Sequence, residues 1–300
     1  MIFDAIIVGG GPAGLNAAIV LGRSRRNVIL FDTGGQRNRF SKGIHNYLTR
    51  DSILPADFLK IAYKEIKKYG TIVHRVEIIH AEKLESGIFF VKDKGGKKFY
   101  SKKLLLATGL RDNIPAVEGI MDFYGRSVFH CPYCDGWEVS NKSIGVYAKN
   151  KNGFELAISL LTWSGKVTLY TDGKAYLKPL EKDALERKKI RVINEKVLKL
   201  EGKKGRLENI VLFNNKKQKC EALFFSNGYH QQCDIAQTLG CEMNKKGVVL
   251  TNRLQQARIE GLYVAGDVAR DMHFVVVAAA EGAKAGVSMN KELQKEEFKK

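Results

Sequence analysis

The sequence predicts an α/β fold made of dinucleotide-binding domains of the Rossmann type. An apolar segment at residues 3–8 is typical of a buried strand, and Gly9, Gly11 and Gly14 follow it in the G-x-G-x-x-G spacing. A segment rich in small residues at 15–22 predicts a helix, and a second apolar strand at 28–31 ends in Asp32. A strand, a glycine turn, a helix and a second strand in this order form the unit that binds dinucleotides.

The glycines and Asp32 have different expected roles in this unit. Glycines let the backbone turn tightly and approach a pyrophosphate, which then lies at the N-terminus of the helix. A carboxylate in the position of Asp32 can accept a hydrogen bond from the ribose hydroxyl of an adenosine. We therefore expect this first unit to bind a dinucleotide.

The length of the chain allows two domains. It has 300 residues, of which 44% are hydrophobic, as is typical of a globular protein. A second strand, helix and strand are predicted at 143–148, after Gly153 and at 166–170, and turn-rich segments at 115–119 and 244–247 are the expected crossings. The chain opens without signal-peptide features, and the apolar run at 274–280 is too short to span a bilayer. We expect a cytoplasmic protein that does not enter a membrane.

The remaining segments predict further elements. An amphipathic helix is expected over 54–69, and the alternation over 72–99 is typical of a small antiparallel sheet with a turn at 94–96. A strand at 104–107 leads into Thr108 and Gly109. A helix rich in small residues is expected over 275–287, and we expect the charged residues 291–300 to be solvated.

The charge balance is strongly basic. The chain has 50 Lys and Arg against 32 Asp and Glu, and its formal net charge is +18. Such a charge favours acidic partners, of which nucleic acid is the first to consider. The basic residues, however, are spread along the chain as pairs such as Lys67-Lys68 and Lys203-Lys204, without a nucleic-acid recognition motif. We expect a solvated basic surface and no nucleic-acid partner, with an acidic protein as the second interpretation.

The segment 130–136 carries the chemistry. It reads His-Cys-Pro-Tyr-Cys-Asp-Gly, so Cys131 and Cys134 have the spacing of a redox-active dithiol. A structural zinc site would need a second pair of ligands, and Cys220, Cys233 and Cys241 are scattered without metal-ligand spacing. The sequence therefore favours redox use and predicts no metal site. In the cytosol a bridging pair is catalytic or redox-sensing.

At these residues the chain resembles a known family. With the strand into Thr108-Gly109 and the segment Gly261–Val268, it is similar to the two-dinucleotide flavoprotein disulfide reductases. The Cys-x-x-Cys of the middle domain brings it nearer to the low-molecular-weight thioredoxin reductases. Cys-Pro-Tyr-Cys, Gly-Gly-Gln-Arg-Asn at 34–38 and Val-Ala-Ala-Ala-Glu-Gly at 277–282 look most like the branch of dithiol oxidases and atypical NADPH-independent reductases.

The resemblance covers nearly all of the chain and implies its architecture. Two three-layer ββα domains are expected, of which the FAD domain is discontinuous and comprises residues 1–115 and 244–300. The middle domain, 116–243, is of the NAD(P) type and carries the Cys-x-x-Cys. In the family, rotation about the two crossings presents the dithiol alternately to the flavin and to a protein substrate. A homodimer is expected by resemblance alone.

The resemblance also implies site residues. Cys134 faces the flavin and forms the transient adduct with it, Cys131 exchanges with the external disulfide or thiol, and Asp135 acts as the acid that handles the thiol protons. Both His130 and His45 are open to a structural or a functional interpretation. The FAD is expected to be held by Gly9, Gly11, Pro12, Ala13, Gly14, Asp32, Gly35, Gln36, Asn38, Asn46, Thr108, Gly109, Gly266, Asp267, Val275 and Val276.

The middle domain departs from the family pattern. Where a second glycine fingerprint belongs, the chain reads Ala148-Lys149-Asn150-Lys151-Asn152-Gly153, and side chains there would crowd a pyrophosphate. Where an arginine-rich loop would read the 2′-phosphate of NADPH, it has Thr171-Asp172-Gly173-Lys174. An acid at this position repels a 2′-phosphate and suits NADH at best. The hypothesis is a dinucleotide fold without ordinary NAD(P)H binding.

The leading interpretation is an FAD-dependent thiol/disulfide oxidoreductase. Its electrons would come from or go to a dithiol with oxygen as acceptor, reduced ferredoxin, or a second FAD in the vacated cleft. Its partner would be a thioredoxin-like or other acidic redox protein, or a small dithiol, and the sequence leaves the direction of electron flow open. The alternatives are an NAD(P)H-dependent thioredoxin reductase, a non-enzymatic flavin-binding module, and a zinc-stabilised nucleic-acid binder.

Overall fold

The computed structural model describes residues 1–149 and 151–299 and divides the chain into two compact units. Unit 1 comprises residues 1–39, 46–111 and 230–300, and unit 2 comprises 40–45 and 112–229. Strands β7 (Leu110–Asp112) and β16 (Tyr229–Gln231) pair with each other at the two crossings. The crossings thus lie at residues 111–112 and 229–230, whereas the sequence suggests 115 and 243.

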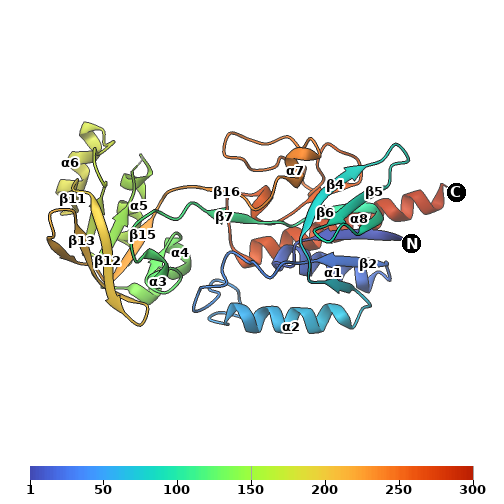
Figure 1. Ribbon diagram of the computed structural model, residues 1–300, viewed down its shortest axis with the longest axis horizontal. Coiled ribbons are helices and arrows are strands. Elements are labelled where there is room, and N and C mark those ends of the chain that lie inside the picture. The colour runs from blue at the N-terminus through green and yellow to red at the C-terminus, as the bar shows by residue number, and fades with distance from the viewer. Residues whose placement is uncertain (150, 300) are drawn as a thin grey trace. The chain divides into compact units, whose positions relative to one another are not determined.

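Unit 1 is built on a seven-stranded sheet with the order β3-β2-β1-β6-β5-β4, in which β17 also pairs with β6 (Figure 1). Its strands are β1 (Ile2–Val8), β2 (Val28–Phe31), β3 (Ile72–His74), β4 (Ile78–Lys83), β5 (Phe89–Asp93), β6 (Lys98–Leu106) and β17 (Leu262–Val264). The first half of β6 runs antiparallel to β5, and its second half runs parallel to β17. One expectation is wrong: β3 does not join the antiparallel strands but pairs in parallel with β2.

Helices cover this sheet. They are α1 (Pro12–Arg23), α2 (Pro55–Lys67), α7 (Ile235–Thr238) and α8 (Val275–Phe298), with a 3₁₀ turn at Asp267–Ala269. Helices α1 and α8 pack so closely that a Cβ on Gly282 would lie 2.0 Å from the carbonyl oxygen of Ala13. The N-termini of both helices lie at the carboxyl ends of strands, which is where α/β proteins bind ligands.

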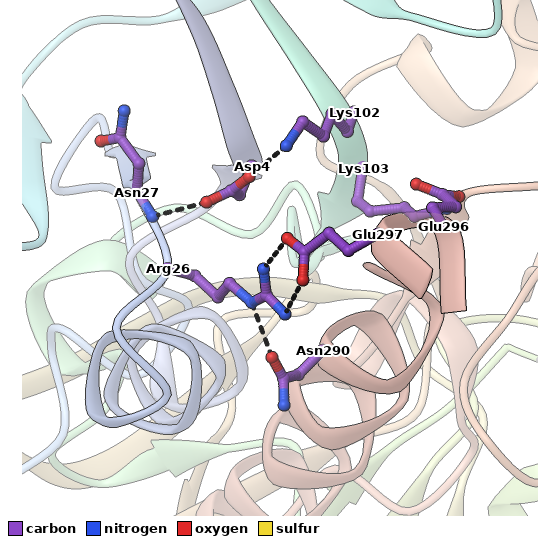
Figure 2. A network of polar contacts seen from close by, with 8 residues as sticks. All are labelled: Asp4, Arg26, Asn27, Lys102, Lys103, Asn290, Glu296 and Glu297. Carbon is purple, nitrogen blue, oxygen red and sulfur yellow. Dashed lines mark hydrogen bonds and ion pairs between the residues drawn. The ribbon is translucent and has the colours of Figure 1, made fainter. Parts of the chain in front are cut away.

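The C-terminal part of α8 continues the helix to Phe298, and most of residues 291–298 are exposed, as expected. Three of its acids nevertheless form ion pairs with other parts of unit 1. Lys103, whose side chain is 4% exposed, pairs with Glu292 at 3.0 Å and Glu296 at 2.5 Å. Arg26 donates to Asn290 at 2.7 Å and pairs with Glu297 (Figure 2). Charged residues that look solvated in the sequence therefore fix the end of the helix.

Unit 2 contains a five-stranded parallel sheet with the order β11-β10-β9-β15-β8 and a separate three-stranded antiparallel sheet, β12-β13-β14. The parallel strands are β8 (Val128–Phe129), β9 (Ile144–Tyr147), β10 (Val167–Tyr170), β11 (Arg191–Ile193) and β15 (Ala222–Phe225). The antiparallel strands are β12 (Val197–Lys203), β13 (Arg206–Leu212) and β14 (Lys217–Lys219). The helices are α3 (Ile120–Phe123), α4 (Pro132–Asp135), α5 (Asn152–Leu160) and α6 (Pro179–Arg187), with a 3₁₀ turn at Trp137–Val139.

The layers of both units agree with the expected Rossmann-like α/β class. Hydrophobic clusters lie on both faces of the main sheet in each unit. Among the helices that the structure describes, none is both long enough and apolar enough to cross a membrane.

Candidate active site

The two cysteines of the Cys-x-x-Cys motif form a disulfide in unit 2. Cys131 follows β8 in an extended conformation and is the N-cap of α4, and Pro132 occupies the first helical position, where its missing N–H costs nothing. The single helical turn separates the two Cα atoms by 5.3 Å. The sequence therefore brings the two sulfurs together through local structure alone.

Asp135 ends this turn, and its environment perturbs its acidity. Burial, and then the negative charge of Glu138, raise the pKa of Asp135 to about 7. Its carboxyl forms no hydrogen bond with any residue that the structure describes. A carboxyl with this pKa can donate or accept a proton near neutral pH, which suits a general acid beside a dithiol.

The surroundings of the disulfide contain partners that the sequence does not reveal. His130 lies 3.6 Å from the buried carboxylate of Asp112, which also accepts a 2.7 Å hydrogen bond from Tyr124. The ring of Tyr133 contacts Trp163 edge-on, with 5.6 Å between centroids. Sequence patterns give no signal for these pairs because the partners are far apart along the chain.

His45 belongs to unit 2, where its Nε2 lies 3.5 Å from Glu138. Glu138 is also the acid that raises the pKa of Asp135. Glu138 therefore has both His45 and Asp135 as neighbours.

In unit 1, the glycine turn has the geometry of a phosphate-binding loop. Gly9 has a φ of +114°, and a Cβ there would lie 2.1 Å from the carbonyl oxygen of Ala107. A Cβ on Gly14 would lie 1.9 Å from the carbonyl oxygen of Gly9, whereas a Cβ on Gly11 would meet nothing within 4 Å. Two glycines are thus required by packing, and the third borders open space at the uncapped N-terminus of α1, beside Pro12 and Ala13.

Asp32 lies at the carboxyl end of β2 and is 6% exposed. Its carboxylate accepts hydrogen bonds from the Gly10 N–H at 3.2 Å, the Gln36 amide at 3.1 Å and the Tyr63 hydroxyl at 2.6 Å, and it pairs with Arg75. The structure therefore brings together Gln36 and Asp32, two of the residues expected to hold FAD. Sequence reasoning misses Tyr63 and Arg75 because neither belongs to the dinucleotide motif.

The loop 34–46 is only partly gathered at this site. Gly35 and Asn38 are half-buried, and a Cβ on Gly35 would lie 3.4 Å from the Gln232 amide. Asn46 is exposed with a φ of +62°, and its N–H donates to Asp51 at 2.9 Å. Asn46 thus has a turn-forming role in this structure.

A second group of expected residues gathers where α8 begins. Thr108 and Gly109 follow β6, and Gly266 follows β17 with a φ of +85° and donates its N–H to Glu281 at 2.9 Å. Asp267 pairs through one oxygen with Arg37 at 3.3 Å, and the same Arg37 nitrogen lies 2.9 Å from His273 Nδ1. Because arginine can only donate, His273 Nδ1 is the acceptor and its Nε2–H donates to the Arg270 carbonyl at 2.8 Å.

These residues fit FAD by their hydrogen-bonding capacity. The second carboxylate oxygen of Asp267 has no partner among the described residues, so it can accept from a hydroxyl of the ribitol. Helix α8 has Phe274 as its N-cap without a side-chain cap, so the N–H groups of Val275 and Val276 are available to an acceptor. Uncapped helix N-termini of this kind favour the negative charge of a reduced flavin.

Where the family pattern has a second dinucleotide in unit 2, side chains at the carboxyl ends of β9 and β10 contact one another. Lys149 reaches from the end of β9 to Asp172 at the end of β10, at 2.5 Å, and Tyr147 donates to the same carboxylate at 2.8 Å. The N-cap of α5 is Lys151, without the glycines of a pyrophosphate loop, and Asn150 lies outside the described residues. Gly153 alone keeps a packing role, since its Cβ would lie 3.1 Å from Ala148 and Leu169.

No group of three or more His, Cys, Asp or Glu side chains that could hold a metal ion is found among residues 1–149 and 151–299. Burial raises the pKa of the Cys220 thiol to about 12 and that of Cys241 to about 11. These thiols are protonated at neutral pH and are poor nucleophiles.

Comparison with known proteins identifies relatives over the whole chain. A family model described as pyridine nucleotide-disulphide oxidoreductase matches residues 3–282. The thioredoxin reductase tcpT of Claviceps purpurea is 31% identical, over 95% of this chain and 92% of that protein. The crystal structure of HlmI has a TM-score of 0.95 at 30% identity, covering 99% of this chain and 94% of HlmI. TrxB of Bacillus anthracis, provisionally described as a thioredoxin reductase, has a TM-score of 0.94 at 30% identity, covering 99% and 100%.

Proposed function

The chain belongs to the pyridine nucleotide-disulphide oxidoreductase family as a thioredoxin reductase-like enzyme, and we propose that it is an FAD-dependent thiol/disulfide oxidoreductase working through Cys131 and Cys134. The observation that carries this proposal is the bridged cysteine pair next to Asp135, whose pKa is raised to about 7. An inert structural disulfide needs no neighbouring acid with a neutral pKa.

The residues of the two units have separate tasks in this proposal. Unit 1 is the FAD-binding domain, and bound FAD supplies a two-electron carrier. Cys131, as a thiolate, attacks one sulfur of an external disulfide and forms a mixed disulfide, which releases the other external sulfur as a thiolate. Asp135 gives its proton to a leaving thiolate. Cys134 then attacks Cys131, so that the external disulfide is reduced to a dithiol and the Cys131–Cys134 bond is formed.

We further propose that unit 2 does not bind NADPH in the ordinary way. The contacts of Lys149 and Tyr147 with Asp172 support this, because a cofactor would have to displace an ion pair before meeting a carboxylate. Asp172 is held ionised: burial opposes its charge, but hydrogen bonds from Lys149, the Val197 N–H and Tyr147 outweigh burial and lower its pKa. A 2′-phosphate at this point would be repelled.

The electron partner follows from this second proposal. One of three electron partners would replace NADPH. The first is a dithiol that reduces the flavin, with oxygen as the acceptor; the second is reduced ferredoxin, and the third is a second FAD. An acidic thioredoxin-like protein or a small dithiol would be the other partner, and the net charge of +18 supports an acidic protein. We place the enzyme in the cytoplasm, since the described Cys220, Cys233 and Cys241 are unbridged, and we expect a homodimer.

The test is anaerobic mixing of the FAD-loaded protein with NADPH, NADH and dithiothreitol while the flavin absorbance is followed. Bleaching by dithiothreitol but not by NADPH supports both proposals. Rapid bleaching by NADPH would support an NAD(P)H-dependent thioredoxin reductase and contradict the second proposal. Unchanged reduction by every donor in the Cys134→Ser variant would favour a flavin-binding module without dithiol chemistry.

A further inference from the structure

The carboxylate of Asp32 has no hydrogen-bonding capacity to spare for a ribose. Asp32 is 6% exposed, and its carboxylate accepts hydrogen bonds from the Gly10 N–H and the Tyr63 hydroxyl. The side-chain amide of Gln36 lies within hydrogen-bond distance of both carboxylate oxygens. Arg75 pairs with the same oxygen as Tyr63. A ribose hydroxyl can therefore bind Asp32 only if one of these donors leaves.

Arg75 is the donor that can leave at the lowest cost. The Gly10 N–H is part of the backbone turn, and Tyr63 and Gln36 are half-buried. The side chain of Arg75, by contrast, is 55% exposed. An ion pair whose basic partner is solvated stabilises a protein little, so Arg75 can turn away from Asp32 without a large loss.

Arg75 is held in place by a second contact that does not involve Asp32. Its guanidinium carbon lies 4.1 Å from the centroid of the Tyr63 ring. A planar guanidinium stacked by one face on an aromatic ring has a second face for another ring. The exposure of Arg75 leaves that face to solvent.

The location of Arg75 specifies the ligand. Strands β2 and β3 are parallel, with Phe31 opposite His74, so Asp32 and Arg75 follow side by side at the carboxyl edge of the sheet. The Asp32 N–H donates to the His74 carbonyl at 3.0 Å and fixes this register. The adenosine half of a dinucleotide binds at this edge, next to the carboxylate that ends the second strand.

We propose that Arg75 binds the adenine of FAD. When a ribose hydroxyl takes its place on Asp32, the guanidinium stays stacked on Tyr63 and packs its other face against the adenine ring. Arg75 and Tyr63 then select cofactors that carry adenosine over FMN, which lacks it. This inference rests on the proposed FAD binding and adds the residues that recognise the adenosine end.

The test is titration of the apoprotein with FAD, ADP and FMN, followed by calorimetry or by flavin fluorescence. In Arg75→Ala, affinity for FAD and for ADP should fall about ten-fold, because a stacking contact of cation–π strength is lost. Affinity for FMN should change less than about two-fold, since FMN has no adenine to stack. Arg75→Lys should behave like the alanine variant, because an ammonium keeps the charge but has no planar face.

Arg23→Ala is the matched control. Arg23 stacks on Tyr69 with 5.3 Å to the ring centroid and donates to its hydroxyl at 2.9 Å. The variant therefore removes a similar arginine–tyrosine contact at the C-terminal end of α1, away from the glycine turn at its N-terminal end. It should bind all three ligands as the unsubstituted protein does. Thermal unfolding of each apoprotein shows whether a variant is folded.

Three results would overturn the inference while leaving FAD binding intact: an unchanged FAD affinity in Arg75→Ala, an equal loss for FAD and FMN, or tighter FAD binding. The last would mean that Arg75 competes with the ribose and does not hold the adenine. If the unsubstituted protein binds no FAD, the proposed function and this inference fail together.

Discussion

The phenolic hydroxyl of Tyr147 donates a 2.8 Å hydrogen bond to Asp172 and ties the carboxyl end of β9 to that of β10. Lys149 and the N–H of Val197, at 2.7 Å, complete the set of donors to this carboxylate. The donors to this carboxylate thus come from β9, from Lys149 and from the start of β12, all within unit 2.

Replacing Asp172 with asparagine should therefore destabilise unit 2. At pH 7 we expect the free energy of unfolding to fall by about 1–3 kcal/mol, the usual cost of losing charged hydrogen bonds. The pKa of Asp172 is below its ordinary value of 3.8, so its stabilisation is present above that pH and is lost as the pH falls through the folded pKa. The difference between the two proteins should thus shrink in acid.

Tryptophan fluorescence during denaturation measures this, because both tryptophans, Trp137 and Trp163, lie in unit 2. Asp183→Asn is the control, since Asp183 is exposed in the same unit. Equal stability of Asp172→Asn and the unsubstituted protein at pH 7 would contradict the structural role of this carboxylate.

Asp135→Asn should slow reduction of a disulfide whose leaving thiolate is basic. General acid catalysis is worth about 10²-fold or more, so turnover of hydroxyethyl disulfide by the pre-reduced protein should fall by about that factor. An aromatic disulfide such as Ellman's reagent releases a thiolate of low pKa that needs no proton, and its rate should change little. A similar loss with both substrates would argue against an acid role.

The pH dependence of the reaction with hydroxyethyl disulfide tests why the pKa of Asp135 is raised. Asp135, with a pKa of about 7, carries its proton below that pH, so the rate with hydroxyethyl disulfide should fall as the pH rises through 7. Glu138→Gln removes the charge that is the second cause of the shift, and should move the fall to lower pH. An unmoved profile would mean that another group titrates.

The contribution of Asp135 to the stability of unit 2 should change with pH in the opposite direction to that of Asp172. The folded pKa of Asp135 is raised, so its contribution is fully present below the ordinary pKa of 3.8 and is lost as the pH rises through about 7. In Asp135→Asn this loss should be absent. Denaturation at pH 4 and pH 8 measures it.

The parts of the fold that sequence predicts are those set by local chemistry. β2 spans 28–31 as the apolar run predicts, and the glycine turn lies where its spacing indicates. Strand β3 is misassigned because a three-residue strand has no periodicity of its own and its partner residues in β2 lie 43 residues earlier. The ion pairs of Glu292 and Glu296 in α8 are not predicted, because their partner Lys103 comes from β6, far earlier in the chain.

The same division holds for the candidate site. Cys131, Cys134 and Asp135 lie in one turn, so their spacing alone predicts their proximity. Two partners of Asp32 come from α2 and from the residue after β3, and the partner of Asp267 is Arg37, which also contacts His273. Tertiary packing selects these residues, and no pattern in a single sequence indicates them.

The two cysteines should differ in reactivity. In the proposed chemistry Cys131 meets the external sulfur, so Cys134→Ser should still form a mixed disulfide with Ellman's reagent and release one equivalent of thiolate. Cys131→Ser should react at least ten-fold more slowly, roughly, because the remaining thiol, Cys134, is expected to face the flavin and not the external disulfide. The double serine variant provides the background from Cys220, Cys233 and Cys241. Equal rates in the two single variants would contradict the assignment of Cys131 to the external sulfur and of Cys134 to the flavin.

Gly282→Ala should disrupt unit 1 through helix packing. A Cβ at this position would lie 2.0 Å from the carbonyl oxygen of Ala13, and backbone cannot give way as a side chain can. The gain in helix propensity is at most about 1 kcal/mol, whereas overpacking costs about 1–3 kcal/mol or more, so the clash should win. Because α1 carries the glycine turn, FAD affinity should fall together with stability.

The neighbouring Gly286 makes a graded pair with it. A Cβ on Gly286 would lie 2.9 Å from the Cβ of Val20 and 3.1 Å from the carbonyl oxygen of Ala17, so it would be less crowded than a Cβ on Gly282. The loss of stability should therefore be larger for Gly282→Ala than for Gly286→Ala. The temperature at which flavin fluorescence appears measures it for unit 1. A Gly282→Ala variant that releases its flavin at the unsubstituted protein's temperature would contradict the close packing of α1 on α8.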